Sequence, residues 1–313
     1  MDQRSTGATG AAEDSNELRD YLRSRRARIT PAEAGLPQTG ARRVPGLRRE
    51  EVAMLAGVSV DYYVRLERGR NLNVSEAVLD AVARALRLNA VERDHLFTLA
   101  RPTRARRRPA PPQRVRTGLL RVVEQWTESP AILIGHRNDV LACNRLARVF
   151  YTDFDALPRH ERNMTRYLFL DESARELYTD WESAARGSVA GLHLYAGRHQ
   201  DDPRLAELVG ELSVRDRDFR RWWADHDVLR RSHGSKSYHH PVAGDLTLEY
   251  EVFNPTGDPD LTLGLYTVEP GSPSQQALRL LADWTAEPAP PRRPAAASAP
   301  AAAPASTSVE LPE

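Results

Sequence analysis

The chain has 313 residues, and its 44 basic and 43 acidic side chains leave a net charge of +1, which excludes a histone-like polycation and a uniformly acidic disordered chain. Hydrophobic residues make up 41% of the chain, and no apolar run approaches the ~20 residues that span a bilayer, so we expect no membrane partner. At about 100–200 residues per domain, this length predicts two domains.

The first half of the chain has helical periodicity throughout. Residues 1–15 lack periodicity and any signal-peptide pattern, so we expect a disordered start to a cytoplasmic protein. A first helix is predicted to end near Arg28, followed by a Gly/Pro-rich loop and a second helix over 47–56, in which Val52, Leu55 and Ala56 share one face. Three more helices are predicted over 60–68, after the cap residue Ser75, and around Leu96. Residues 16–100 should therefore form an all-α domain.

A short glycine turn joins the second and third of these helices. Gly57 ends the second helix, because glycine readily adopts the left-handed conformation at a helix C-terminus. Ser59 then caps the third helix, whose residues Tyr63 and Leu66 are predicted to be buried. Two short helices at a steep angle form a helix-turn-helix, in which the second helix projects its first side chains into the DNA major groove.

The spacing of these residues resembles a known DNA-binding family. Val52-Ala53, Ala56-Gly57-Val58-Ser59 and Leu66-Glu67-Arg68-Gly69 are similar to the Cro/lambda-repressor type of helix-turn-helix, also called the XRE family. The resemblance implies double-stranded operator DNA as the partner and places Val60, Asp61 and Arg65 at base-facing positions. An unrelated helical bundle with a glycine turn is the alternative.

Each base-facing position has a chemical interpretation. The planar guanidinium of Arg65 can pair with both major-groove acceptors of guanine. Asp61 can accept a hydrogen bond from cytosine, or it can simply complement the helix dipole. The resemblance implies phosphate contacts from Ser59 and Tyr62. 

Further arginines flank the motif. Arg49 stands where the family commonly has glutamine, and it is predicted to contact phosphate. Glu67 is expected to tie the recognition helix to its neighbour. Additional phosphate contacts, or simple solvation, are predicted for Arg42, Arg43, Arg68 and Arg70.

An Arg/Pro-rich stretch divides the chain. Residues 101–112 combine like charges with prolines, which predicts an extended linker, and residues 286–313 are an Ala/Pro-rich tail predicted to be disordered. Residues 1–112 contain 21 arginines and 14 acidic residues, a net charge of +7, whereas residues 113–287 have a net charge of −6. This asymmetry favours a polyanion-binding module joined to a domain with another role, although the arginines could also be a solvated surface.

The second half, residues 113–285, mixes strands and helices. Residues 131–135 and 140–144 flank Arg137-Asn-Asp139 and predict a β-hairpin. Four helical stretches follow near 145–153, 163–170, 172–195 and 203–226, the last split near Asp216. Strands near 236–240, 246–253 and 261–268 and a helix over 274–284 complete the order. This order is typical of an α+β PAS-like sensor domain with a small-molecule pocket between sheet and helices.

Several segments resemble the ligand-binding domain of MmyB-like transcription regulators. They are residues 137–147, 201–213, 219–228, 234–241 and 269–274. The resemblance implies a small hydrophobic ligand, with fatty-acid-like molecules as the class. Family members commonly have tryptophan where this chain has Cys143, so that position is altered here; as the single cysteine, it cannot form an internal disulfide.

Aromatic residues are the candidates for lining a ligand pocket. The five are Tyr195, Trp222, Trp223, Tyr238 and Tyr250. The alternative for each is an ordinary packed core. Trp222 and Trp223 are about 100° apart on a helix, so one of them should face a neighbouring domain or a dimer partner.

No catalytic site or cofactor is predicted. His226, His233, His239 and His240 have no zincin spacing, and the adjacent pair His239 and His240 should point to opposite faces of a strand. We therefore expect a homodimeric transcriptional regulator rather than an enzyme or a metalloprotein. Two alternatives remain, namely an enzyme with a DNA-binding anchor and a scaffold whose acidic half recruits a partner protein.

Overall fold

The computed structural model of the chain contains two packed units. Predictions made for Arg43, Arg70, linker residues 102–112 and the tail lie outside the described residues. The described residues are 7–37, 42, 44, 46–69, 74–101, 113–258 and 260–284, with side chains described from Glu17 onward in the first helix.

The N-terminal unit is all-helical, as predicted. Its helices are α1 (Gly7–Arg28), α2 (Arg49–Leu55), α3 (Val60–Glu67), α4 (Glu76–Ala85) and α5 (Ala90–Ala100). Helix α1 begins inside the segment 1–15 that was predicted to be disordered. Its first residues are rich in alanine, and extending a helix that is already nucleated costs little free energy.

Side-chain caps and a small core determine this arrangement. Ser75 accepts a hydrogen bond from the backbone N–H of Val78, and Asn89 forms a capping box with Glu92. The prediction for Leu55 is wrong: α2 buries Val52, Ala53 and Ala56, while Leu55 remains 38% exposed. At 100° per residue, Ala56 lies between Val52 and Ala53, whereas Leu55 lies about 60° beyond Val52 and so outside the buried face.

The C-terminal unit is built around one antiparallel sheet. Its strands are β1 (Ala131–Ile134), β2 (Val140–Cys143), β3 (His233–His240), β4 (Gly244–Phe253) and β5 (Thr262–Thr267), in the order β2-β1-β5-β4-β3. The predicted β1–β2 hairpin is confirmed, with Ile132 opposite Cys143. Its turn contains Arg137 and Asn138 with positive φ angles of 57° and 64°.

Helices occupy the segment between β2 and β3. They are α7 (Arg145–Phe150), α8 (Met164–Leu170), α9 (Glu172–Leu177), α10 (Trp181–Arg198), α11 (Pro203–Arg215) and α12 (Arg217–Ala224), with a short 3₁₀ turn at Phe154–Ala156. Another 3₁₀ turn, His136–Asn138, lies between β1 and β2. The split at Asp216 is confirmed, because Asp216 caps α12. The single helix predicted over 172–195 is wrong, since Tyr178 pairs with Tyr238 of β3 and Asp180 starts a new helix.

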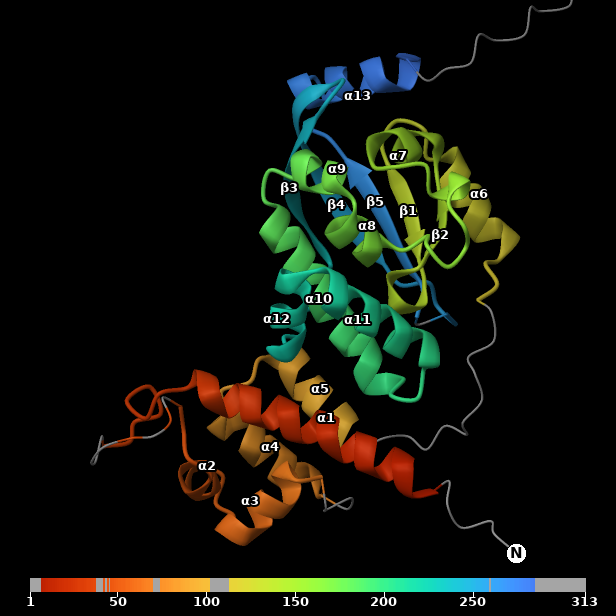
Figure 1. The fold of residues 1–313 in the computed structure, drawn as a ribbon. Coiled ribbons are helices and arrows are strands. Elements are labelled where there is room, and N and C mark those ends of the chain that lie inside the picture. Colours follow the sequence, from red (N-terminus) through yellow and green to blue (C-terminus); the bar gives the residue numbers. More distant parts are fainter. Residues whose placement is uncertain are drawn as a thin grey trace, which may run out of the picture.

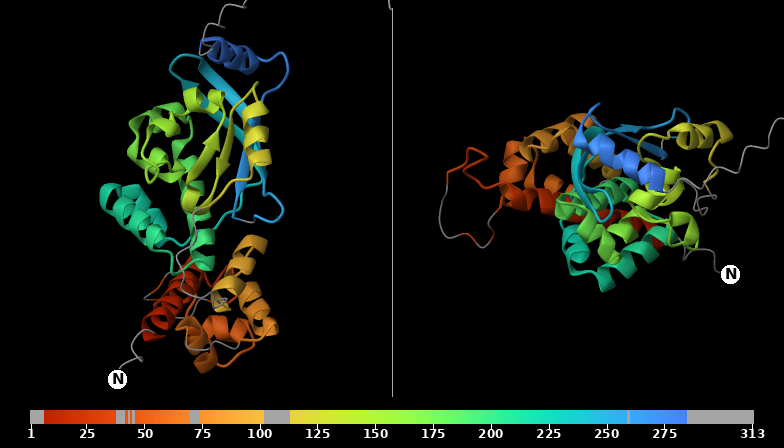
Figure 2. Two further views of the ribbon diagram at one scale, coloured as in Figure 1. Left: turned by 90° about the vertical axis from the view of Figure 1, so that its right-hand side faces the viewer. Right: turned by 90° about the horizontal axis from the view of Figure 1, so that it is seen from above.

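The sheet separates two apolar layers. Helix α6 (Thr117–Gln125), which the sequence did not predict, covers one face, where Val123 packs with Ala131, Leu133 and Leu263. The larger core lies on the other face against α7–α12, and α13 (Pro273–Trp284) packs against β4 and α7. Figure 2 shows this layering from the side.

Helices α1 and α5 connect the two units. Figure 1 shows α1 lying between the sheet-containing unit and α2–α3, which are at the far end of the molecule. Val228, which follows α12, is buried in the N-terminal core. Buried Arg25 of α1 donates a 2.5 Å hydrogen bond to the carbonyl of His226 and lies 3.4 Å from the carboxylate of Asp227. No helix among the described residues is long and apolar enough to cross a membrane.

Candidate nucleic-acid interface and candidate ligand site

The turn between α2 and α3 has the predicted geometry. Gly57 has a φ of +66°, the left-handed region that favours glycine, and its N–H donates to Met54 at 3.1 Å. Ser59 caps α3 by accepting a hydrogen bond from the N–H of Tyr62 at 3.2 Å. The side chain of Ser59 is therefore engaged with the helix start, at the point where α3 presents its N-terminus to solvent.

Helix α3 has one buried and one exposed face. Tyr63, Leu66 and Glu67 are buried, as predicted for the first two. Val60, Asp61 and Arg65 are exposed, and Tyr62 is half-buried. Among the described residues, Asp61, Arg65 and Arg68 have no ion pair or side-chain hydrogen bond. Arg65 and Arg68 therefore offer unpaired guanidinium groups at the surface. Five residues on or beside this face were predicted to contact DNA, namely Ser59, Val60, Asp61, Tyr62 and Arg65.

A buried carboxylate joins three helices at the end of α3. Glu67 is fully buried, and its Oε1 accepts hydrogen bonds from Nη2 and Nε of Arg49 at 2.9 and 3.1 Å. Its Oε2 lies 3.5 Å from Nε of Arg26 on α1. Burial and this carboxylate raise the pKa of the neighbouring Tyr63. The predicted role of Glu67 in tying α3 to its neighbour is confirmed, and Arg49 is held at the start of α2 while 45% exposed.

Arg42 has a structural partner rather than a free head group. Its Nη1 and Nη2 donate to the two oxygens of Glu51 at 2.9 and 2.8 Å, and Nη2 also donates to the carbonyl of Gly46. Glu51 in turn accepts from the backbone N–H of Arg48 at 2.6 Å. These bonds hold the preceding loop against the start of α2, so Arg42 is less available for phosphate than Arg65 or Arg68.

The centre of the second unit is filled by aromatic rings. Phe150, Tyr151, Tyr178 and Tyr238 are mutual neighbours, with ring centres 4.9–6.5 Å apart where they meet. The hydroxyls of Tyr151 and Tyr238 lie 3.4 Å apart. Burial raises the pKa of Tyr151, Tyr178 and Tyr238 well above that of an exposed tyrosine, so their hydroxyls stay protonated. This aromatic cluster lies between the sheet and α7–α9.

The five predicted ligand residues are in four different places, and Tyr195 lies apart from the other four residues. Tyr238 and Tyr250 are buried on the sheet. Trp222 is buried against Phe169 and Trp181, and its indole N–H has no acceptor among the described residues. Trp223, on the neighbouring face of α12, stacks on His193 and lines a cavity shared with α1, as the 100° spacing predicted.

Tyr195 belongs to a polar network at the end of the sheet. Its hydroxyl donates to Oδ2 of Asp202 at 2.7 Å, and Arg137 bridges Asp202 and Asp139 at 2.6 Å each. Both the ring and the hydroxyl of Tyr195 are therefore engaged within the protein, the ring against His199.

Two cavities open on the second unit. One, of about 460 Å³, is lined by polar residues at the start of α10 and by residues 227–231. The other, of about 300 Å³, lies between α1 and α10–α12. Of the five aromatic residues predicted to bind a ligand, only Trp223 lines one of these two cavities, and it lines the smaller one.

Sequence reasoning missed several residues that organise this unit. Tyr151, Tyr178 and Tyr266 belong to the aromatic cluster, and the inward alternation along β5 was the available signal for Tyr266. Asn144, which is buried, was missed as well. Its Oδ1 caps α7 and also accepts from the N–H of Ala131 at 3.1 Å. Cys143 is a buried free thiol, and burial raises its pKa to about 11.

Two protein-family models match the chain. A family model described as the MmyB-like transcription regulator ligand binding domain matches residues 115–281, from just before α6 into α13. The chain belongs to the MmyB-like transcription regulator family. A helix-turn-helix domain model matches residues 17–96, which cover α2, α3 and α4 and parts of α1 and α5 of this MmyB-like regulator. None of the curated proteins compared with the chain matches it.

The two matches agree with the two structural units. Together they make the MmyB-like regulator a DNA-binding transcription regulator with a ligand-binding domain. Both families describe regulator domains, which are typically non-enzymatic. The helical unit with α2 and α3 is thus the helix-turn-helix domain of the chain, and the layered sheet unit is its ligand-binding domain.

Proposed function

We propose that this regulator reads a specific operator sequence through the exposed face of α3. The observation that carries the proposal is the exposed face of α3, with Val60 and Asp61 beside the capped N-terminus and Arg65 in the last turn. Arg65 is unpaired among the described residues, so its fork can bond the O6 and N7 atoms of a guanine. The apolar side chain of Val60, 45% exposed, suits a thymine methyl group.

Phosphate contacts would position α3 in the groove. Arg49 uses Nε and Nη2 on Glu67, which leaves Nη1 for a phosphate oxygen. Arg68, at the other end of α3, has no partner among the described residues and offers a second cation. A helix of eight residues reads few base pairs, and a homodimer on two half-sites about one helical turn apart would supply the missing specificity.

The ligand-binding domain would bind a small apolar ligand, with fatty-acid-like molecules as the proposed class. The strand order β2-β1-β5-β4-β3, with all of α7–α12 inserted between β2 and β3, supports a PAS-like sensor. The aromatic cluster around Tyr238 gives an apolar surface with protonated hydroxyls, suited to an acyl chain and its carboxylate. Binding there would require these rings to move, and that movement is how ligand and DNA affinity would be linked.

The DNA proposal is tested by selecting preferred sequences from a random duplex pool and measuring affinity at fixed salt. Arg65→Ala should weaken binding to the selected site by about 1–3 kcal/mol and relax preference at one position in each half-site. Arg121→Ala is the matched control, because Arg121 is exposed on α6 and its substitution removes the same charge. An unchanged sequence profile for Arg65→Ala would refute base reading by α3.

The ligand proposal has a separate test. Native mass spectrometry of freshly purified protein should show a co-purifying molecule of lipid size. After delipidation, titration with palmitic acid should restore a ligand-bound mass. Tyr238→Trp, which adds volume inside the aromatic cluster, should reduce that binding. Protein that stays apo and does not respond to palmitic acid would contradict the fatty-acid class and favour a scaffold that recruits a partner protein. Neither result affects the DNA proposal.

A further inference from the structure

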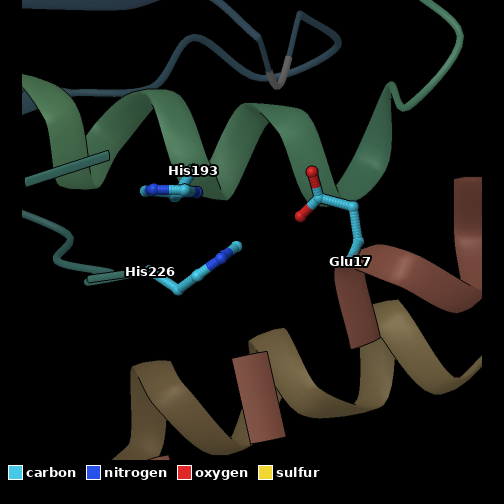
Figure 3. A group of neighbouring side chains, drawn as sticks. All are labelled: Glu17, His193 and His226. Carbon is cyan, nitrogen blue, oxygen red and sulfur yellow. The ribbon is translucent and has the colours of Figure 1, made fainter. Parts of the chain in front are cut away.

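Three side chains from both domains meet at the domain interface. Glu17 comes from α1, His193 from α10, and His226 from the residues just after α12. One ligand atom of each lies within 4.8 Å of the others, and Figure 3 shows the two imidazole rings and the carboxylate directed toward a shared space. These residues are up to 209 positions apart in the sequence, and no spacing rule brings them together.

His193 is oriented as metal-binding histidines usually are. Its Nε2 lies 2.9 Å from the carbonyl oxygen of Trp223, and since a carbonyl can only accept, Nε2 carries the proton. Nδ1 therefore has a free lone pair. The Trp223 ring stacks on His193 with centres 3.9 Å apart and planes at 15°, which fixes the ring. A histidine ligand whose other nitrogen donates to a backbone carbonyl is the recurring arrangement at metal sites.

His226 has the spacing that a shared ion requires. Its ring centre lies 5.0 Å from that of His193. Two imidazoles bound to one tetrahedral ion at about 2.0–2.1 Å place their ring centres about 5 Å apart. His226 also has a φ of +53°, which is strained for a residue with a side chain. Arg25 donates a 2.5 Å hydrogen bond to the carbonyl of His226, and this bond keeps the backbone in that conformation.

No cationic side chain among the described residues neutralises the carboxylate of Glu17. Glu17 is half-buried and forms no ion pair with any described residue. It lines the 300 Å³ cavity together with Asp20 and His226, so the cluster opens to an entry path and a further coordination position. At that cavity, both amide atoms of Gln200 are buried without a hydrogen-bond partner among the described residues. A polar group held in the cavity would satisfy them.

We propose that Glu17, His193 and His226 bind a divalent transition-metal ion of the zinc type. Two imidazole nitrogens and one carboxylate oxygen are the ligands that Zn²⁺ accepts in three-residue protein sites, with the fourth position left for water or another ligand. One ligand belongs to the DNA-binding domain and two to the ligand-binding domain, so the ion would hold the two together. This is a function separate from operator reading and from apolar ligand binding.

The test is metal binding by the full-length protein after removal of metal with a chelator. Calorimetric titration with Zn²⁺ should give one ion per chain, and Co²⁺ in its place should give the visible absorption of a tetrahedral site with nitrogen and oxygen ligands. Glu17→Gln and His226→Asn should each weaken Zn²⁺ binding at least tenfold. Asparagine tolerates the left-handed backbone at 226, so this variant should fold.

A matched control separates the site from adventitious binding. His160→Asn removes an exposed histidine, 78% accessible, that lies beside the carboxylate of Glu161, and it should leave Zn²⁺ affinity unchanged. In the wild type, Zn²⁺ should also slow amide hydrogen exchange in α1 and residues 225–228, and Glu17→Gln should abolish that protection. The proposal is overturned if wild type binds no stoichiometric ion, or if folded Glu17→Gln and His226→Asn bind Zn²⁺ as the wild type does.

Discussion

A methyl group added at one glycine of α10 should disturb the contact between the two domains. Gly197 faces α5, and a Cβ atom built on it would lie 2.6 Å from Cε1 of His95 and 3.4 Å from Cδ2 of Leu99. His95 cannot move away easily, because it is buried and its ring packs edge-on against Tyr21 at 4.9 Å. Gly197→Ala therefore forces α10 and α5 apart or displaces a packed ring.

The magnitude follows from two opposing terms. Alanine in place of glycine inside a helix stabilises it by roughly 0.5–1 kcal/mol. Overpacking a close contact costs about 1–3 kcal/mol. Gly191 lies on the same helix with no heavy atom within 4 Å of an added Cβ, so Gly191→Ala has the gain without the cost. The free energy of unfolding of Gly197→Ala should thus be about 1–3 kcal/mol lower than that of Gly191→Ala.

Urea unfolding followed by far-UV circular dichroism measures this difference. His95→Ala provides a second test. In the double variant with Gly197→Ala, most of the overpacking penalty should disappear, so the changes in unfolding free energy at the two sites should not be additive. Hydrogen exchange should locate the loss in α5 and α10. Equal stabilisation by Gly197→Ala and Gly191→Ala would refute the close approach of the two domains at His95.

Three other outcomes are expected. Burial, then the charge of Arg25, lowers the pKa of His95 to about 3. Because the unfolded chain protonates this histidine near 6.5, the free energy of unfolding should fall by about 2 kcal/mol from pH 7 to pH 5, and His95→Phe should lessen that fall in urea titrations. Glu67→Gln should lower the free energy of unfolding by about 1–3 kcal/mol, whereas exposed Glu50→Gln should change it by less than about 0.5. Asn144→Ala, which removes a helix cap and leaves buried partners unsatisfied, should cost about 2–4 kcal/mol in the same assay.

The N-terminal domain could be predicted from sequence because its determinants are local. Gly57 and Ser59 set the turn through one left-handed residue and one cap, and both act within three residues. The burial of Leu55 could not be judged in this way. Which residues of a short amphipathic helix are inside depends on where neighbouring helices lie, and here α2 turns Ala53 inward instead.

In the second domain, contacts between distant parts of the chain determine helix boundaries and side-chain neighbours that sequence periodicity does not specify. The break between α9 and α10 arises where Tyr178 pairs with Tyr238, 60 residues later in the chain. The aromatic residues predicted to line one pocket are divided among the sheet, the core, the domain interface and the polar network of Tyr195. The hydrophobic pattern indicates that a residue is buried but not which residues surround it. Glu17 and His193 carry no motif, and only the docking of α10 on the N-terminal unit, mainly against α5, brings them together.

Two adjacent arginines on α1 connect the two functional ends of the molecule. Arg25 bonds the carbonyl of His226 in the ligand-binding domain, whereas Arg26 lies against Glu67 at the end of α3 and donates to the carbonyl of Leu47 at 2.6 Å. The two side chains leave α1 at neighbouring positions, so contacts from both domains converge on one turn of this helix. Helix α1 therefore joins the residues after α12 to the end of α3 through side-chain contacts, in addition to the covalent connection between the domains.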